Sequence, residues 1–516
     1  VQGFLNLSLQ DSVWIEILAG IKQDAHPLAL ADKNEKVLIE YSSPNTNKPL
    51  HLGHLRNNFL GFSVSQILAA AGYEVIKTNL VNDRGIHICK SMLAYQLFGN
   101  EETPASSGLK GDHLVGKYYV AFDKAYKAEI ETLVQQGIEA EEAKKQAPIL
   151  LKAQEMLLAW EQNDPEVLAL WEKMNNWVFD GFAKSYAQMG VSFDKIYRES
   201  NTYLLGKKLV DEGLAQGVFF RKDDGSVWID LTEEGLDEKL VLRRDGTSVY
   251  ITQDMGTAQL KYEDFGAKRS VYVVGNEQDY HFEVLFHILK KLNKPFSEGN
   301  YHLSYGMVDL PSGKMKSREG TVVDADDLMA EMVNTAQSRT LELGKIEGFS
   351  AEEANALFNQ LGLGALKYFL LKVDPKKRML FNPEESIDFQ GNTGPFIQYT
   401  HARICSMTRK AASMGIDMKI SVGKSYDLAE SEQELIFLLG NYKSKIQEAA
   451  AQFAPSVIAQ YTYDLAKQFN KFYNELSIIN EEDETKQKIR LSLVEMTGKT
   501  IQQAALLLGV IVPERM

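Results

Sequence analysis

The sequence has few cysteines and no long apolar run. Only 2 of its 516 residues are cysteines, Cys89 and Cys405, so the chain cannot form a disulfide framework or a four-cysteine zinc site. We expect both thiols to be reduced, as in a cytoplasmic protein. No apolar stretch is long enough to span a bilayer, and no membrane partner is expected. The first residues lack a secretory signal and an initiator Met, so we expect the natural chain to begin upstream.

The sequence also lacks an excess of basic residues. The net charge is −14 at pH 7, which argues against a general affinity for nucleic acid. The excess of acid lies before Pro395, because the segment from Pro395 to Met516 carries equal numbers of basic and acidic residues. A neutral C-terminal segment with clustered lysines can still hold RNA, while the acidic part can bind a cationic small molecule.

Alternating strands and helices predict a parallel, doubly wound sheet. The first group has strands at 37–39 and 74–80 and helices at 55–71 and 86–97. The second has strands at 271–274 and 301–308 around a helix at 280–292. Such alternation is typical of an α/β fold with right-handed crossovers. Ligands in these sheets bind at the carboxyl ends of the strands, at the switch point between the halves.

The rest of the chain is predicted to be mostly helical. Residues 1–9 alternate like a strand, 11–24 form a helix and 25–35 a polar connector. A loop at 99–111 precedes a helical insertion at 112–189. Strands follow at 218–220, 226–229 and 240–251, with Asp245-Gly246 as a hairpin turn, and then a helix at 255–263. Residues 324–364 and 395–516 are predicted to be helical.

One stretch between the first strand and the first helix carries a candidate phosphate site. It reads Tyr41-Ser-Ser-Pro-Asn-Thr-Asn-Lys-Pro-Leu-His-Leu-Gly-His-Leu-Arg56. His51 and His54 are three residues apart, so both lie on one face of the first helical turn. The free N–H groups and the dipole at that end attract phosphate. Gly53 would let a flat ring such as a purine approach the backbone. For an isolated His-x-x-His, two surface histidines would be the better interpretation.

A second candidate is the loop Pro311-Ser-Gly-Lys-Met-Lys-Ser-Arg-Glu-Gly320, which follows the last predicted strand. Three cations lie within five positions of each other. By itself this pattern is equally typical of a basic surface loop.

Together, the two stretches resemble the signatures of class I aminoacyl-tRNA synthetases. His-Leu-Gly-His after Ser-Ser-Pro-Asn-x-x-Lys-Pro resembles the family's His-Ile-Gly-His, in the form of the arginyl subgroup. Lys314 and Met315 match the start of the second signature, Lys-Met-Ser-Lys-Ser, whereas Lys316 and Ser317 depart from it. In arginyl-type enzymes that second lysine is often lost, and a lysine upstream of the histidines, here Lys48, is thought to replace it.

The resemblance implies adenylation of arginine by ATP with Mg²⁺, followed by transfer to tRNA(Arg). The implied catalytic residues are His51, His54, Lys48, Lys314 and Lys316, and the implied ATP-binding residues are His51, Gly53, His54, Lys314, Met315 and Ser317. A planar guanidinium is best held by a carboxylate. The implied arginine-binding residues are Glu40, Ser43, Pro44, Asn45, His54, Tyr250, Asp254 and Gln278. Each alone has an ordinary alternative, such as a strand-end charge, a helix N-cap or a polar turn residue.

A third stretch, Gly391-Asn-Thr-Gly-Pro-Phe-Ile-Gln-Tyr-Thr-His-Ala-Arg403, resembles the junction into the family's anticodon-binding domain. Aromatic and basic residues there could stack on unpaired bases and contact phosphates. The candidates are Tyr399, Arg403, Lys467, Lys471 and Tyr473. We expect at least half of the downstream aromatics, Phe453, Tyr461, Tyr463, Phe469, Phe472 and Tyr473, to be helical core instead.

We therefore expect three parts. Residues 1–34 are a remnant of an N-terminal domain with a connector, 35–394 a Rossmann-like catalytic domain with insertions at about 100–200 and 215–250 and a helical stem, and 395–516 an all-helical anticodon-binding domain. The resemblance implies a cytoplasmic monomer without zinc. Two alternatives stay open: a non-catalytic RNA-binding relative, and an enzyme that adenylates a free small molecule.

Overall fold

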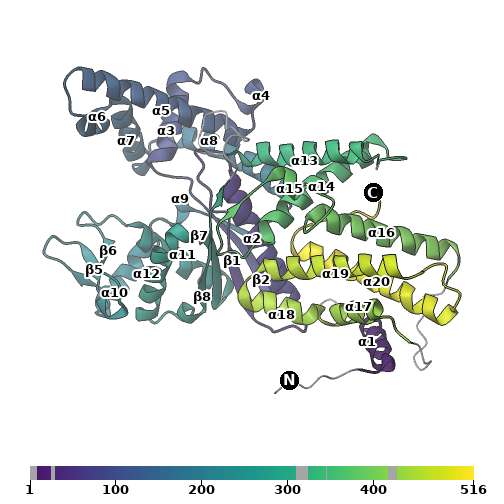
Figure 1. Ribbon diagram of the computed structural model, residues 1–516. Helices are drawn as coiled ribbons and strands as arrows, with labels where there is room; N and C mark the ends of the chain where they lie inside the picture. Colours follow the sequence, from purple (N-terminus) through teal and green to yellow (C-terminus); the bar gives the residue numbers. More distant parts are fainter. Residues whose placement is uncertain (1–8, 25–29, 310–322, 345, 417–426) are drawn as a thin grey trace.

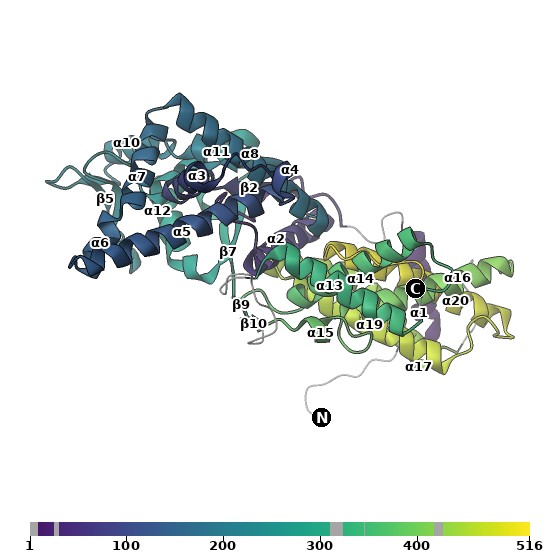
Figure 2. The ribbon, with the colours of Figure 1, turned by 90° about the horizontal axis from the view of Figure 1, so that it is seen from above.

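The computed structural model describes residues 9–24, 30–309, 323–344, 346–416 and 427–516. A central sheet has a helical insertion beside it and a long helical region on its other side (Figure 1). From above, the molecule is elongated, with the sheet and the insertion at one end and the C-terminal helices at the other (Figure 2). Residues 1–8 of the strand predicted at 1–9, and the basic loop with Lys314, Met315, Lys316 and Ser317, lie outside the described residues.

The predicted doubly wound sheet is confirmed. Its five strands are all parallel and lie in the order β3-β2-β1-β7-β8. The chain starts at the centre with β1, builds outwards on one side and then on the other, so the switch point lies between β1 and β7. The bounds are β1 Lys36–Glu40, β2 Glu74–Val81, β3 Lys195–Arg198, β7 Arg269–Gly275 and β8 Asn300–Tyr305.

Strand β1 shows why this stretch is a central strand. Val37 and Ile39 pack in the same core as helix α2, while Leu38 faces the opposite side with Ile76 and Ala267. These three apolar side chains are at most 1% exposed, because a central strand of a parallel sheet is covered on both faces. The helices that connect the strands are α2 Leu52–Ala70, α3 Ile86–Phe98, α11 Tyr250–Phe265 and α12 Asp279–Lys291.

Two predictions around the sheet were wrong. Strand β3 was missed, because it lies at the edge of the sheet and three of its four residues are exposed, which removes the apolar signal. The third strand of the small sheet ends at Leu242, and helix α11 begins at Tyr250 where a strand was expected to continue to residue 251. Asp245 and Gly246 do lie in a turn, in which Gly246 N donates to Arg243 O.

The insertion is helical, as expected, and holds five helices. These are α4 Pro104–Ser107, α5 Gly111–Gln135, α6 Ala140–Gln146, α7 Pro148–Glu161 and α8 Pro165–Met189. Helix α4 interrupts the segment expected to be a loop. Short helices α9 Glu199–Thr202 and α10 Gly206–Ala215 lead into an antiparallel three-stranded sheet of β4 Phe220–Arg221, β5 Val227–Ile229 and β6 Lys239–Leu242.

The C-terminal half is helical, as predicted. The stem contains α13 Ala325–Glu342, α14 Ala351–Leu371 and α15 Pro383–Ser386, with a parallel pair of β9 Val308–Asp309 and β10 Met379–Leu380. The terminal helices are α16 Gly394–Ser413, α17 Glu430–Gly440, α18 Tyr442–Gln452, α19 Pro455–Glu475 and α20 Glu484–Leu507. Four of the six predicted aromatics, Phe453, Tyr461, Phe469 and Phe472, are buried, which confirms that at least half are core.

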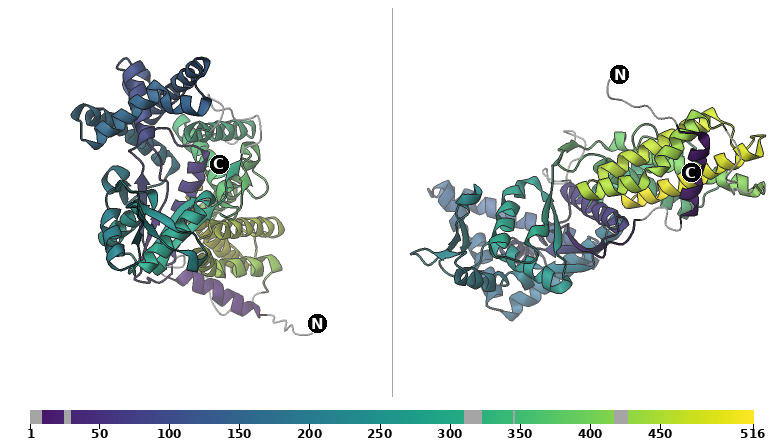
Figure 3. Two further views of the ribbon diagram at one scale, coloured as in Figure 1. Left: turned by 90° about the vertical axis from the view of Figure 1, so that its left-hand side faces the viewer. Right: turned by 90° about the horizontal axis from the view of Figure 1, so that it is seen from below.

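Helix α1, Asp11–Gln23, lies on these C-terminal helices (Figure 3). Its Asp11 accepts a hydrogen bond from Leu428 N, and Lys22 forms an ion pair with Glu495 at 2.9 Å. Both cysteines are free, as expected. In the described part of the chain, no helix has the length and apolar character needed to cross a membrane.

Candidate active site

The turn after β1 is held in a strained conformation. Ser42 and Ser43 have φ values of 81° and 45°, which non-glycine residues rarely adopt. Two side-chain amides hold this turn: Asn57 Oδ1 accepts from Ser42 N at 2.5 Å, and Asn79 Oδ1 accepts from Ser43 N at 2.9 Å. The chain then runs beside the end of β2, where Asn45 forms a bridge with Asn82. The turn therefore projects Asn45 at the carboxyl edge of the sheet.

His51 and His54 cap helix α2 reciprocally. Gly53 N donates to His51 Nδ1, and His51 N donates to His54 Nδ1, both at 3.1 Å. The ring centroids are 4.0 Å apart. Because each Nδ1 accepts a hydrogen bond, a neutral ring carries its proton on Nε2. The pair therefore offers two Nε2–H donors at a helix N-terminus, where anions bind favourably.

Burial and a neighbouring lysine keep both rings neutral. Burial, with a smaller contribution from the Lys48 charge, lowers the pKa of His51 to about 4. The pKa of His54 is held well below its ordinary value by burial and by the charges of His51 and Lys48. The structure thus brings together three of the predicted catalytic residues, His51, His54 and Lys48. Gly53 lies against the His51 ring, since a Cβ at Gly53 would sit 3.0 Å from His51 Cε1.

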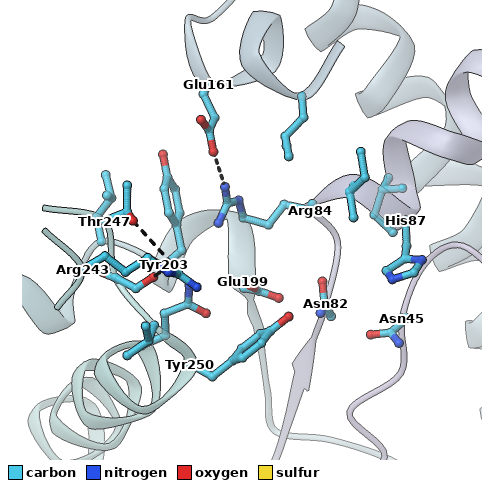
Figure 4. A pocket seen from close by; sticks show the side chains of 18 of the residues that line it. Asn45, Asn82, Arg84, His87, Glu161, Glu199, Tyr203, Arg243, Thr247 and Tyr250 are labelled. Carbon is cyan, nitrogen blue, oxygen red and sulfur yellow. Dashed lines mark hydrogen bonds and ion pairs between the residues drawn. The ribbon is translucent and has the colours of Figure 1, made fainter. Parts of the chain in front are cut away.

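A pocket of about 730 Å³ opens at the carboxyl ends of β1, β2 and β3. Asn45 and Tyr250 were predicted to be site residues, and both line it. In Figure 4 the Tyr250 ring points toward Asn82 and Asn45, with Glu199 above it. Tyr250 is 71% exposed, although exposed tyrosine faces are uncommon away from binding surfaces. The sequence reasoning missed most of the remaining lining, including Arg84, His87, Glu161, Glu199, Tyr203, Lys207 and Arg243.

One wall of the pocket is an ion pair stacked on a ring. Arg84 contacts Glu161 at 2.9 Å and lies 4.0 Å above the Tyr203 ring. The preceding residue, Asp83, accepts hydrogen bonds from Ser200 N and Oγ, both at 2.8 Å. The sequence signal for this wall is Asn82-Asp83-Arg84-Gly85, a polar run directly after a buried strand.

Glu199 is a carboxylate in this pocket that no pattern had indicated. Burial, partly offset by the charge of Arg84, raises its pKa to about 7, and Asp83 and Asp254 add to the rise. The Asp254 charge is thus close enough to act on Glu199, and Asp254 itself is directed to His281, whose Nε2 lies 2.6 Å from Asp254 Oδ2.

The other predicted arginine-binding residues lie apart from this pocket's lining. Glu40 is 6% exposed and forms a buried ion pair with Lys261 of α11. Pro44 is buried, Ser43 is exposed, and Gln278 is exposed at the end of a 3-10 turn after β7.

In the part of the chain that the structure describes, one group of side chains has the spacing of a metal site: Asp112, His113 and Asp326. The Lys110 ammonium lies among them, 3.1 Å from Asp112 Oδ2 and in contact with Asp326. A resident cation therefore already neutralises these carboxylates, and the group is a salt-bridge cluster.

Comparison with known proteins identifies the family. The family described as "tRNA synthetases class I (R), catalytic domain" matches residues 17–382, and the "DALR anticodon binding domain" matches residues 397–516. The chain is 59% identical to the arginine–tRNA ligase of Amoebophilus asiaticus and 56% identical to that of Bacteroides thetaiotaomicron, covering all of this chain and 87% of each relative. The chain belongs to the class I arginine–tRNA ligase family.

Solved structures agree with this family assignment in fold. The arginyl-tRNA synthetase of Thermus thermophilus aligns with a TM-score of 0.78 at 23% identity, covering 100% of this chain and 88% of that one. A methionyl-tRNA synthetase of Mycobacterium tuberculosis aligns with a TM-score of 0.56 at 12% identity, covering 93% of this chain and 92% of that one. Both likenesses show the class I fold.

In this arginine–tRNA ligase family member, three of the predicted tRNA-binding residues are adjacent on α16 and α19. The Arg403 guanidinium lies 4.9 Å from the ring centroids of both Tyr399 and Tyr473. Lys467 is exposed on α19, whereas Lys471 forms an ion pair with Glu434 at 3.0 Å. The first three residues form a stacked group at the surface, and Lys471 has an acidic partner that a phosphate would have to replace.

Proposed function

We propose that this chain activates L-arginine with ATP and transfers the arginine to the 3'-terminal ribose of tRNA(Arg). The proposal is supported by its identity of 53–59% with proteins named arginine–tRNA ligase and by the chemistry that its site offers. Adenylation is attack by a carboxylate on the α-phosphorus of ATP with loss of pyrophosphate. The protein needs only to align the reactants and to stabilise negative charge.

The histidine pair suits this chemistry. Neutral His51 and His54 each offer an Nε2–H donor, and such donors to phosphate oxygens gain strength as charge develops in the transition state. Lys48 is close enough to depress both histidine pKa values, and it places a cation beside the same phosphates. Lys314 and Lys316, with Met315 and Ser317, are proposed to neutralise the departing pyrophosphate. Mg²⁺ arrives with ATP and shields the phosphate charge.

The arginine side chain is proposed to bind beside Tyr250 and Asp254. These residues lie one turn apart at the start of α11, so both face the same side. His281 contacts Oδ2 of Asp254, which leaves Oδ1 available to a guanidinium. Asn45, in the strained turn with Ser43 and Pro44, is proposed to hold the amino-acid end with His54, and Gln278 to complete the pocket. Glu40 contributes from the end of β1 through its ion pair with Lys261.

The tRNA anticodon is proposed to meet the stacked group on α16 and α19. Tyr399, Arg403 and Tyr473 present π-faces and a guanidinium on which unpaired bases can stack. Lys467 and Lys471 lie on the same helix as Tyr473 and can contact phosphates.

The single observation that carries the proposal is the pair of neutral, reciprocally capped histidines at the N-terminus of α2, directly after the turn that places Asn45 in the lining of the same pocket as Tyr250. The test is ATP–pyrophosphate exchange with each of the twenty amino acids, with and without total tRNA. Exchange with arginine alone supports the proposal. Exchange driven by a different amino acid, or no exchange even with tRNA present, would overturn it.

A further inference from the structure

The salt-bridge cluster joins the insertion to the start of α13. Lys110 donates to Ser185 Oγ at 2.6 Å, and Ser185 Oγ donates to Asp326 Oδ1 at 2.8 Å. His113 Nε2 lies 3.1 Å from Asp326 Oδ2 and 3.4 Å from Asp324 Oδ2. Burial by itself would raise the pKa of Asp326, but hydrogen bonds from His113 and Lys110 outweigh it and keep the pKa below its ordinary value. Asp326 is therefore a fixed anion with three side-chain partners.

The same segment is bonded to the backbone on both sides of His51. Leu52 N donates to Val323 O, and Ala325 N donates to Leu50 O, both at 3.0 Å. These bonds pair Asp324 with His51 as an isolated antiparallel bridge. Asp324 also caps α13, since its Oδ1 accepts from Asp326 N at 2.8 Å and from Asp327 N at 3.2 Å. A movement of Asp326 would therefore be passed through one residue to the backbone that flanks His51.

The helical insertion also contacts the segment between β1 and α2 directly, at Pro49. Helix α5 presents Gly116 to Pro49, and a Cβ at Gly116 would lie 2.8 Å from Pro49 Cδ. One turn earlier on α5, a Cβ at Gly181 of α8 would lie 2.2 Å from Asp112 Oδ1. Helices α5 and α8 are thus packed too closely to shift independently.

We propose that Asp326, held by Lys110, His113 and Ser185, is a positioning residue that fixes the backbone around His51 for the adenylation step. This inference rests on the proposed function. In this proposal Asp326 acts through the bridge at residues 323–325, which sets the direction of the Nε2–H donors. A displacement of catalytic groups by about 1 Å can cost on the order of 100-fold in rate, so a partial loss of this anchor should be visible in kcat.

The test compares Asp326→Asn with Asp123→Asn, a matched control on α5 whose carboxylate forms an ion pair with Lys127 at 2.6 Å. In ATP–pyrophosphate exchange, Asp326→Asn should lower kcat by about tenfold or more and leave the arginine KM and the tRNA Kd within about twofold. Asp123→Asn should behave like the unmodified protein. Ser185→Ala, which removes one hydroxyl and carries little risk to folding, should lower the same kcat by a smaller factor.

A second readout does not depend on activity. Hydrogen exchange of the amides of Leu52 and Ala325 should be at least about tenfold faster in Asp326→Asn and unchanged in Asp123→Asn. Equal amide protection in the two variants would overturn the inference. Faster amide hydrogen exchange in Asp326→Asn without a loss of kcat would overturn it as well. So would a loss of kcat accompanied by an equal rise in the arginine KM. If the unmodified protein shows no arginine-dependent ATP–pyrophosphate exchange, the proposed function fails. Amide hydrogen exchange then still decides whether Asp326 holds the bridge between residues 50–52 and 323–325.

Discussion

Acid should destabilise the folded chain through its histidine pair. His51 has an ordinary pKa of 6.5 and a folded-state pKa of about 4, so the unfolded chain binds a proton in a pH range where the folded chain does not. Stability is therefore highest above pH 6.5 and falls as the pH decreases toward 4. His54 acts in the same direction, because its pKa is lowered as well.

The magnitude for His51 follows from the two pKa values. Between about pH 7 and about pH 5, linkage removes about 2 kcal/mol of unfolding free energy through this one group. Carboxylates also titrate close to this pH range. The test therefore compares the pH dependence of the unfolding free energy of the unmodified protein with that of His51→Gln. Glutamine keeps a polar atom near Gly53 N and has no proton to gain. The substitution also removes the hydrogen bond from Gly53 N to His51 Nδ1, and this loss shifts the unfolding free energy by an amount that does not depend on pH.

The assay is urea unfolding followed by circular dichroism at both pH values. The stability difference between the two proteins should change by about 2 kcal/mol, with His51→Gln less sensitive to acid. His287→Gln is a suitable control, because His287 lies on α12 away from the pair. Parallel pH dependence of the unmodified protein and His51→Gln would refute the argument that His51 is neutral because it is buried.

Three other substitutions test the proposed roles. Asp254→Asn should raise the arginine KM by about 10- to 100-fold with an unchanged ATP KM, because a charge-assisted hydrogen bond is worth about 1.5–3 kcal/mol; equal arginine KM values would contradict the pocket assignment. Gly53→Ala should lower kcat by about tenfold without lowering the melting temperature, because alanine favours helix while its Cβ would meet the His51 ring at 3.0 Å. Arg403→Gln should weaken tRNA binding in filter assays and reduce its salt dependence by about one phosphate contact, and Lys499→Gln, in an exposed pair with Glu495 on α20, is its control.

The fold was predictable where apolar periodicity is strong. Buried strands β1 and β7 and the long helices carry that signal. It fails at β3, whose side chains are mostly exposed, and at the start of α11. Before α11, alternating residues after Asp245-Gly246 favour a strand, but Thr252 donates to Val241 O, and this tertiary contact supports a helix from Tyr250.

The site was predictable where a motif is contiguous. His51, His54 and Lys48 lie in one stretch and are close enough for the lysine charge to act on both rings, and Asn45 from the same stretch lines the pocket. Glu199 and Arg84 come from elements more than 100 residues apart. Arg84 lies in a short polar run after β2, and Glu199 carries no pattern of its own. Their positions in the pocket depend on which strand ends lie side by side, and the sequence alone does not give the spatial order of the strands.

Helix α2 shows the physical limit most clearly. Arg56, Asn58 and Ser63 are all fully buried, although such residues are usually exposed on a helix. Each donates to a distant or local carbonyl: Arg56 to Gly306 O and Pro375 O, Asn58 to His54 O, and Ser63 to Leu507 O.

These bonds tie one helix to the last strand of the sheet, to the stem and to the end of α20. These partners reduce a burial cost that would be several kcal/mol for an unpaired polar group. The position of the histidine pair is therefore set by carbonyl groups that lie about 250 to 450 residues away along the chain, and carbonyls are common to every residue type. Because the atoms that accept these hydrogen bonds are backbone carbonyl oxygens, no particular residue type in the sequence marks them. The orientation of His51 can therefore be derived only after the C-terminal helices have been placed.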